Sequence, residues 1–307
     1  MLVAAAEAAG VPLLVGHHRR HNPMIQKAKE IVTSGRLGKL VSVHGFFWLM
    51  KPDDYFEVAW RRAAGAGPVL TNLIHDIDLL GYLVGEIASV QALASNAVRG
   101  FEIEETAAVL LEFTNGVVGT VNVSDTIVAP WSWEQTTGKN PVYPQTDQSC
   151  YTIGGTHGAL TVPKLEVWSN SGTRSWWEPI EAQRIYAALH DLLRLQIQHL
   201  CAVVRGESKP LVSGQDGLQT LRVIQAIKAA AVSGTRIAIK ALRPLADQDS
   251  AAAFAFDDHS LAAAGAADGG KTAGAFAQDS LGVGFHGSHG LVHQRCSDFD
   301  LLGCNCR

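Results

Sequence analysis

The sequence predicts an α/β protein in which a short strand-and-helix unit is followed by an α+β domain with a sizeable, mostly antiparallel sheet. The apolar run VPLLVG at 11–16 leads into a helical pattern, as expected for a strand buried on both faces of a parallel sheet. Residues 107–124 form two apolar strands around Asn115-Gly116, the preferred hairpin turn. Further short strand patterns follow at 151–155, 159–162 and 165–170. Strands grouped in this way favour a layered α+β domain.

Composition narrows the class of protein. With 47% hydrophobic residues, the chain can bury a substantial core. Its length of 307 residues suggests about two domains. The net charge of -4 and the lack of a basic cluster argue against nucleic acid or a membrane surface as partner, and favour a small molecule. Five cysteines without a disulfide framework fit a reducing compartment, so we expect a cytoplasmic protein. No apolar run is long enough to span a bilayer.

The first ten residues are predicted to be the end of a helix, with Gly10 at its C-terminus. No capping residue precedes this helix, so we expect that the chain lacks its beginning. The polar residues after the strand at 11–16 are His17, His18, Arg19, Arg20 and His21. Ligands of open α/β sheets bind beyond the carboxyl ends of the strands, which places these residues on the ligand side. The alternative is an exposed polar loop.

A helix is predicted to begin at Pro23, capped by Asn22, and to end at Gly35. A β-branched and aromatic strand follows from Leu40. The mixed loop after it ends in Trp60 and Arg61 beside a glycine loop. An aromatic plane next to a guanidinium suits a planar or anionic ligand, and it suits ordinary surface packing equally well.

The stretch at 65–78, GAGPVLTNLIHDID, runs from this glycine loop into a buried helix that carries His75. Thr71 or Asn72 is expected to cap the helix through its side chain. An imidazole in the first turn, with Asp78 one turn away to hold its tautomer, can accept a proton near neutral pH. The alternative is a core histidine with satisfied hydrogen bonds.

Beyond this helix, the two-residue turn predicts that Leu110 faces Val121 and that Ala108 faces Val123. The loop at 129–145 is expected to be a lid, a site wall or an oligomer contact. Helices are predicted at 187–204 and 218–233, followed by a last strand in TRIAIK.

The composition of residues 241–307 predicts a low-complexity, disordered tail. The tail contains metal-binding residue types, His286, His289, His293, Cys296, Cys304 and Cys306. Their spacing fits no common zinc motif, so no metal site is predicted.

Six motifs occur in an order that resembles the glucose-fructose oxidoreductase, inositol dehydrogenase and MocA (Gfo/Idh/MocA) family: VGHHRRHNP, SGRLGKL at the end of a helix, WRRAAGAGP, NLIHDIDLL, EETAAVLLEFTNG and IGGTHGAL. The resemblance implies a Rossmann domain that holds NAD or NADP, and a C-terminal domain with a large open sheet that binds substrate and joins subunits into a homo-oligomer. It assigns residues 1–38 to a remnant of the Rossmann-type domain, 39–240 to the α+β domain and 241–307 to the tail.

The resemblance also implies the role of each site residue. His75 would be the catalytic base, and Trp60, Arg61 and His17 would contact the cofactor. The substrate-binding residues would be Arg19, Arg20, Thr71, Asn72 and Asp78. The reaction would be hydride transfer between the nicotinamide and a carbinol carbon of a sugar, cyclitol or related polyhydroxylated molecule.

Three departures from the family bear on activity. In the matched order, the phosphate-binding Gly-x-Gly-x-x-Gly motif and the ribose-binding acid would lie before Met1, as would the Glu-Lys-Pro segment. The family's aspartate four residues before the histidine is replaced by Thr71. We therefore expect this chain as written to be inactive. The alternative is a non-catalytic, sugar-binding or oligomer-forming pseudoenzyme.

Overall fold

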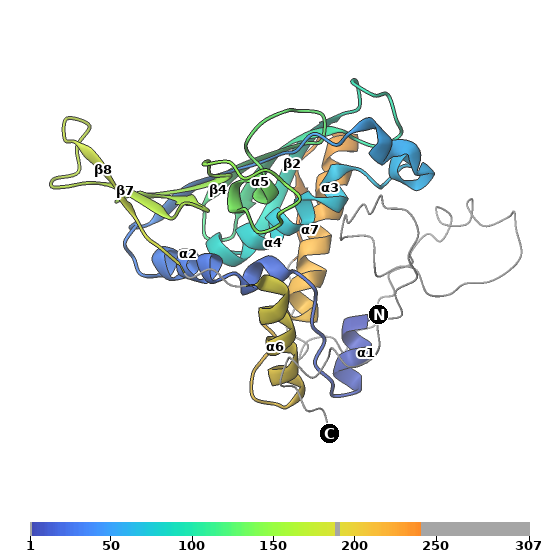
Figure 1. The fold of residues 1–307 in the computed structure, drawn as a ribbon, viewed down its shortest axis with the longest axis horizontal. Helices are drawn as coiled ribbons and strands as arrows, with labels where there is room; N and C mark the ends of the chain where they lie inside the picture. The colour runs from blue at the N-terminus through green and yellow to red at the C-terminus, as the bar shows by residue number, and fades with distance from the viewer. Residues whose placement is uncertain (1, 188–190, 241–307) are drawn as a thin grey trace, which may run out of the picture. The chain divides into compact units, whose positions relative to one another are not determined.

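A nine-stranded sheet organises residues 2–187 and 191–240, which are the residues that the computed structural model describes (Figure 1). Its strand order is β8-β7-β6-β5-β1-β4-β3-β2-β9, and all neighbours are antiparallel except β1 and β4. The strands are β1 (Leu40–Trp48), β2 (Ile87–Ser95), β3 (Thr106–Phe113), β4 (Val118–Ser124), β5 (Tyr151–Gly155), β6 (Ala159–Val162), β7 (Glu166–Asn170), β8 (Ile180–Arg184) and β9 (Ile237–Ala238). The predicted large, mostly antiparallel open sheet is confirmed.

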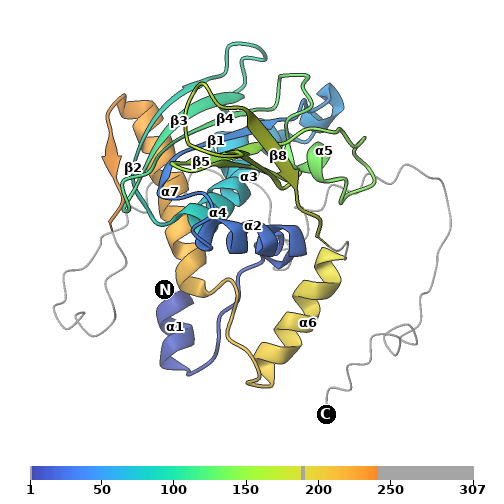
Figure 2. The same ribbon diagram turned by 90° about the vertical axis from the view of Figure 1, so that its left-hand side faces the viewer.

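Helices cover one face of this sheet. The α-helices are α1 (Leu2–Ala8), α2 (Pro23–Thr33), α3 (Pro68–Thr71), α4 (Leu73–Val84), α5 (Trp133–Thr137), α6 (Leu192–Val204) and α7 (Gly214–Ser233). Short 3-10 helices are η1 (His18–His21), η2 (Asp53–Glu57) and η3 (Ala59–Arg62). Figure 2 shows α2, α4 and α7 on the same side of the sheet. None of the described helices is long and apolar enough to cross a membrane.

The predicted start of α2 is confirmed. The Asn22 side chain accepts a hydrogen bond from the Met24 backbone N–H at 3.0 Å, and Pro23 occupies the first turn. The predicted apolar side is buried, and it consists of Ile25, Ala28, Ile31 and Val32. The described residues belong to one compact unit that runs from Met1 to Leu242, so a separate domain at 1–38 stays a prediction.

The segment 11–16 differs from its predicted form. It makes one isolated antiparallel bridge, between Leu14 and Ser213, and joins no strand of the sheet. Its apolar side chains are only partly buried or exposed. The prediction of a strand buried in a parallel sheet is therefore wrong for the described residues, because no parallel neighbour lies beside this segment there.

The hairpin of β3 and β4 forms as predicted, but its register is shifted by one residue. The Phe113 N–H donates to the Val117 carbonyl, which leaves a loop of Thr114, Asn115 and Gly116. Gly116 has a φ of 83°, as in three-residue loops that end in a left-handed glycine. The expected two-residue turn is therefore wrong.

A shift of one residue exchanges the two faces of a strand. Val109 faces Val121, and both are buried, whereas Leu110 faces Thr120 and is 54% exposed. The predicted pairs of Leu110 with Val121 and of Ala108 with Val123 are thus wrong. The buried face belongs to the odd-numbered residues of β3.

Neighbouring glycines in β5 provide a test of the packing between β5 and the loop that follows α2. A Cβ at Gly155 would collide with the Leu37 carbonyl group, whose carbon would lie only 3.0 Å away, whereas a Cβ at Gly154 would meet its nearest atom at 3.6 Å. We predict that Gly155→Ala lowers the free energy of unfolding by about 1–3 kcal/mol, the usual cost of overpacking. The matched control Gly154→Ala should change it by less than about 0.5 kcal/mol. If urea unfolding showed equal changes in the free energy of unfolding for Gly155→Ala and Gly154→Ala, this packing would be contradicted.

Candidate active site

His75 lies in the first turn of α4, which follows the glycine loop and the short helix α3. Gly67 permits this loop to pass against Glu104, because a Cβ at Gly67 would collide with the Glu104 carboxylate. Glu104 Oε1 accepts a hydrogen bond from the Val69 backbone N–H at 3.1 Å and so holds the first turn of α3. The chain leading to His75 is therefore anchored at both the loop and α3.

Thr71 and Asn72 lie in the junction between α3 and α4. Thr71 Oγ1 donates to the Gly67 carbonyl at 3.1 Å and to Asn72 Oδ1 at 3.0 Å. Asn72 occupies the N-cap position of α4 without a capping side-chain hydrogen bond. The predicted side-chain cap is therefore wrong, because Thr71 already belongs to α3 and bonds within it. Contact of these two residues with substrate stays a prediction.

Three imidazoles meet at this point. His17 Nδ1 lies 3.4 Å from His75 Nδ1, and the two rings are nearly perpendicular. The His18 ring lies 5.7 Å from the His75 ring. The structure thus brings the expected cofactor-side residue His17 against the expected base His75, and it adds His18, which was expected on the ligand side without a role of its own.

Burial holds these imidazoles in their neutral form. It lowers the pKa of His75 well below 6.5, and the nearby Arg19 guanidinium lowers that pKa further. Burial is also the main cause that lowers the pKa of His17 and that brings the pKa of His18 to about 4. A neutral imidazole at physiological pH can accept a proton, as the predicted role of His75 requires.

Two buried ion pairs connect η1 to α4. Arg20 binds Asp78 through two parallel hydrogen bonds, with Nε to Oδ2 at 3.0 Å and Nη2 to Oδ1 at 2.7 Å. Arg19 Nη1 donates to Asp76 Oδ1 at 3.1 Å. All four residues are less than a tenth exposed. The pairs hold His17 and His18 against the face of α4 that carries His75.

These pairs change the interpretation of Asp78. Its carboxylate is bonded to Arg20 and also lies 3.5 Å from the Thr220 hydroxyl, which donates to it. The expectation that Asp78 holds the tautomer of His75 is therefore wrong, and His17 takes the position beside His75 Nδ1 instead. Because Arg19 and Arg20 are both bonded to carboxylates, their geometry favours a positioning role over the predicted contact with substrate.

Trp60 and Arg61 lie on η3, away from these contacts. The Arg61 guanidinium stacks over the Tyr55 ring at 4.2 Å and donates to the Tyr55 carbonyl at 3.0 Å. Trp60 is 45% exposed, and the Arg61 guanidinium lies 5.6 Å from its ring. The structure therefore shows the packed surface arrangement that was the alternative for this pair, and contact with a cofactor stays a prediction.

The sequence analysis missed three residues that surround Arg19. Asp76 and Tyr151 are fully buried beside it, and Glu134 Oε1 accepts from Arg19 Nη2 at 3.0 Å. The Arg19 guanidinium also lies 5.0 Å above the Trp133 ring. The sequence feature that could have identified Asp76 is an acidic residue within an otherwise mostly apolar helix. Burial raises the pKa of Asp76 to about 6.

The described residues contain no group of three or more metal-ligating side chains. They also lack a strand, glycine loop and helix unit of the dinucleotide-binding kind. The spacing Gly-x-Gly-x-x-Gly does occur at Gly282, Gly284 and Gly287, outside the described residues, but no strand pattern precedes it in the sequence. The described residues alone therefore do not fit the phosphates of a dinucleotide. The histidines and cysteines of the tail likewise lie outside the described part.

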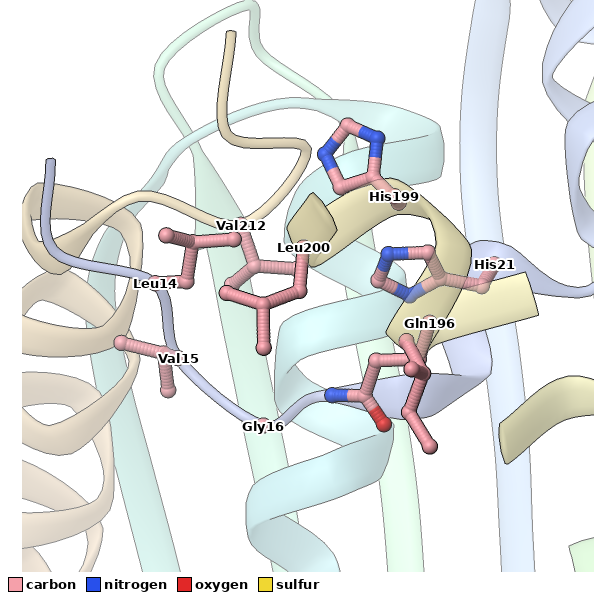
Figure 3. Close-up of a pocket in the computed structure, with 9 residues that line it drawn as sticks. Leu14, Val15, Gly16, His21, Gln196, His199, Leu200 and Val212 are labelled. Atoms are coloured by element: carbon pink, nitrogen blue, oxygen red, sulfur yellow. The ribbon is translucent and has the colours of Figure 1, made fainter. Parts of the chain in front are cut away.

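A separate cavity of about 210 Å³ lies between residues 14–21 and α6 (Figure 3). The His21 and His199 rings are 5.2 Å apart in its wall, and both nitrogens of His21 are buried without a hydrogen-bond partner. Most of the remaining lining is apolar. His75 does not line this cavity, so it is not the space in which the predicted base would act.

The neutral state of His18 predicts a pH dependence of stability. Its folded pKa of about 4 lies below the ordinary value of 6.5, so between these values the unfolded state binds a proton that the folded state does not. Stability should therefore fall as pH falls through this window, by about 1 kcal/mol per pH unit from His18. We predict that His18→Gln removes about 2 kcal/mol of the loss between pH 7.5 and 5. If urea unfolding gave the same loss of unfolding free energy between pH 7.5 and 5 for His18→Gln and for the wild-type chain, His18 would be protonated in the folded state.

Comparison with known proteins agrees with this fold. Residues 25–161 match the family described as GFO/IDH/MocA C-terminal domain. The chain is 26% identical over 253 residues to a D-apiose dehydrogenase of Paraburkholderia graminis, an alignment that covers 78% of this chain and 63% of that protein. It is 23% identical over 237 residues to a 1,5-anhydro-D-fructose reductase of Ensifer adhaerens, covering 76% and 66% of the two chains.

Among solved structures, the WlbA dehydrogenase of Bordetella pertussis in complex with NADH and UDP-GlcNAcA is similar. The identity is 25%, the TM-score is 0.58, and the match covers 78% of this chain and 66% of that one. The chain thus spans slightly less than two thirds of the length of these relatives. The family match, the ordered motifs and the shared fold together support a Gfo/Idh/MocA family oxidoreductase.

Proposed function

We propose that this chain carries the substrate side of an NAD(P)-dependent oxidoreductase. The reaction is hydride transfer between the nicotinamide and a carbinol carbon of a sugar, cyclitol or related polyhydroxylated small molecule. The observation that carries the proposal is the contact of the partly buried His75 with His17, in surroundings that lower the pKa of His75. Two relatives, a D-apiose dehydrogenase and a 1,5-anhydro-D-fructose reductase, support a sugar-like substrate, and the NADH complex of a third supports a nicotinamide cofactor.

His75 supplies the acid-base step. Oxidation of a carbinol requires that the hydroxyl proton leaves as hydride leaves the same carbon, and a neutral imidazole can take that proton. A bound nicotinamide supplies the hydride acceptor. His17, 3.4 Å from His75 Nδ1, orients the ring so that its other nitrogen is the one offered to substrate. Thr71 and Asn72, one turn before His75, are the proposed substrate contacts, and Trp60, Arg61 and His17 are the proposed cofactor contacts.

A second candidate is a non-catalytic, sugar-binding or oligomer-forming pseudoenzyme. The observation that favours it is that both arginines expected to face substrate are bonded to buried carboxylates. Thr71 in place of the family's aspartate also removes a carboxylate from the acid-base set. The two candidates differ in what replacement of His75 does to turnover.

We also propose that the chain forms a homo-oligomer through its sheet. The face opposite the helices carries a row of contacting aromatic rings, in which Phe46 lies 4.9 Å from Trp48 and 5.7 Å from Trp131. Leu93 and Leu110 add exposed apolar area on neighbouring strands. Apolar surface of this kind marks an interaction site more often than plain solvent contact.

Cofactor titration tests what these 307 residues can bind by themselves. We predict that NADH and NADPH show no micromolar binding to the purified chain in calorimetry, because its described residues offer no phosphate-binding loop. Saturable micromolar binding of either nucleotide would contradict this and would at once indicate which of the two is preferred.

Replacement of His75 tests its role in a form of the protein that shows turnover. We predict that His75→Ala lowers kcat by about 10²–10⁴-fold, the usual contribution of a general base, with little change in the free energy of unfolding. His21→Ala is the matched control, because His21 lines the separate cavity and should leave kcat nearly unchanged. If His75→Ala lowered kcat and the free energy of unfolding to a similar extent, His75 would be a core histidine rather than a general base.

A further inference from the structure

The ring of His75 holds a positive charge poorly. His75 is partly buried, and burial lowers its pKa well below 6.5. The Arg19 guanidinium and the neighbouring imidazoles of His17 and His18 lower that pKa further. No carboxylate of the described residues is among the groups that shift it. A proton that His75 takes from substrate therefore has to move on before the ring regains its neutral form.

His17 is in position to receive that proton. Its Nδ1 atom lies 3.4 Å from His75 Nδ1, and the two rings are nearly perpendicular. The His18 ring is also near, with its centre 5.7 Å from that of His75, but in the described part of the chain the His75 ring bonds to His17 alone. Hydrogen bonds between catalytic groups are often this long before the reacting molecule binds, and they shorten in the complex.

The role of His75 as a base fixes which ring atoms carry protons at rest. A neutral imidazole has one N–H group and one free nitrogen. For His75 Nε2 to accept a proton, His75 Nδ1 has to carry the N–H group and donate it to His17 Nδ1. His17 then carries its own proton on Nε2. Neither Nε2 atom is among the fully buried, unpartnered nitrogens of the described residues, so burial closes neither end of the pair.

The surrounding charges favour transfer toward His17. Burial lowers the pKa of His17, and the guanidinium groups of η1 lower it further. Two carboxylates oppose them, because Asp78 of α4 and Asp216 of α7 both raise the pKa of His17. No carboxylate of the described residues does the same for His75. The pair is therefore asymmetric, and His17 holds an added proton more readily than His75 does.

We propose that His17 relays the proton that His75 takes from the substrate hydroxyl, an inference that rests on the proposed function. The substrate O–H bond breaks as a bond from His75 Nε2 to that proton forms. The His75 Nδ1–H bond breaks as a His17 Nδ1–H bond forms, which leaves His75 neutral and His17 charged. His17 then releases its Nε2 proton to water, so one proton enters the pair and one leaves it. After product leaves, exchange with water returns both rings to their resting tautomers.

Nitrogen NMR of the imidazoles in the full chain tests the relay without any turnover. Near pH 7.5 we expect a proton on His75 Nδ1 and on His17 Nε2, and we expect the first proton added to this pair on acidification to appear on His17. A resting proton on His75 Nε2, or a first added proton on His75, would overturn the proposal.

Two variants sharpen the NMR test. His17→Phe removes the acceptor, so the His75 ring should become a mixture of its two neutral tautomers. His18→Phe is the matched control, because the His18 ring is near His75 without a hydrogen bond to it, and this variant should leave the proton on His75 Nδ1. Equal tautomer mixtures in the two variants would contradict the relay.

Chemical rescue tests the relay in a form of the protein that shows turnover. We expect His17→Phe to lower kcat by about 10²-fold, the low end of acid-base contributions, and free imidazole in the buffer to restore most of that loss by taking the proton in place of His17. An unchanged kcat, or a loss that imidazole does not restore, would overturn the relay. If His17→Phe does not fold, the tautomers of the wild-type chain decide the outcome. Failure of the proposed function shows separately, as turnover that survives His75→Ala.

Discussion

The candidate site depends on two consecutive arginines of η1 that are neutralised by two aspartates of α4. Arg19 with Asp76 and Arg20 with Asp78 are both buried, and loss of either arginine would leave a buried carboxylate without its cation, at a cost of about 3–5 kcal/mol. Because Arg19 and Arg20 follow directly after His17 and His18, the same pairs place those imidazoles against His75. The pairs therefore set both the packing of η1 and the geometry of the site.

Arg19 has a second effect, which is electrostatic. Its charge contributes to the lowered pKa of His75, after burial, so the residue that positions η1 also keeps the imidazole neutral. Glu134 brings α5 to the same guanidinium. The segment between β4 and β5, expected to be a lid, a site wall or an oligomer contact, is thus attached to the site through one arginine.

Local patterns predicted much of this fold. The cap of α2 at Asn22, the strand from Leu40 and the short strands β5 to β7 follow from propensity and capping, which act over a few residues. The register of β3 with β4 did not follow, because a single added loop residue decides it. The segment 11–16 failed for a related reason, since a buried parallel strand needs neighbours that the local pattern cannot supply.

The site was predictable only in part. His75 and His17 were identifiable from their position after a glycine loop and a strand pattern. Pairing of Arg19 with Asp76 spans 57 positions and pairing with Glu134 spans 115, and such distant contacts leave no periodic signal in a single sequence.

The most direct test of the account is an NMR titration of the His75 imidazole, assigned with His75→Gln. The account predicts that His75 stays neutral well below pH 6.5, whereas titration with an ordinary pKa near 6.5 would contradict it.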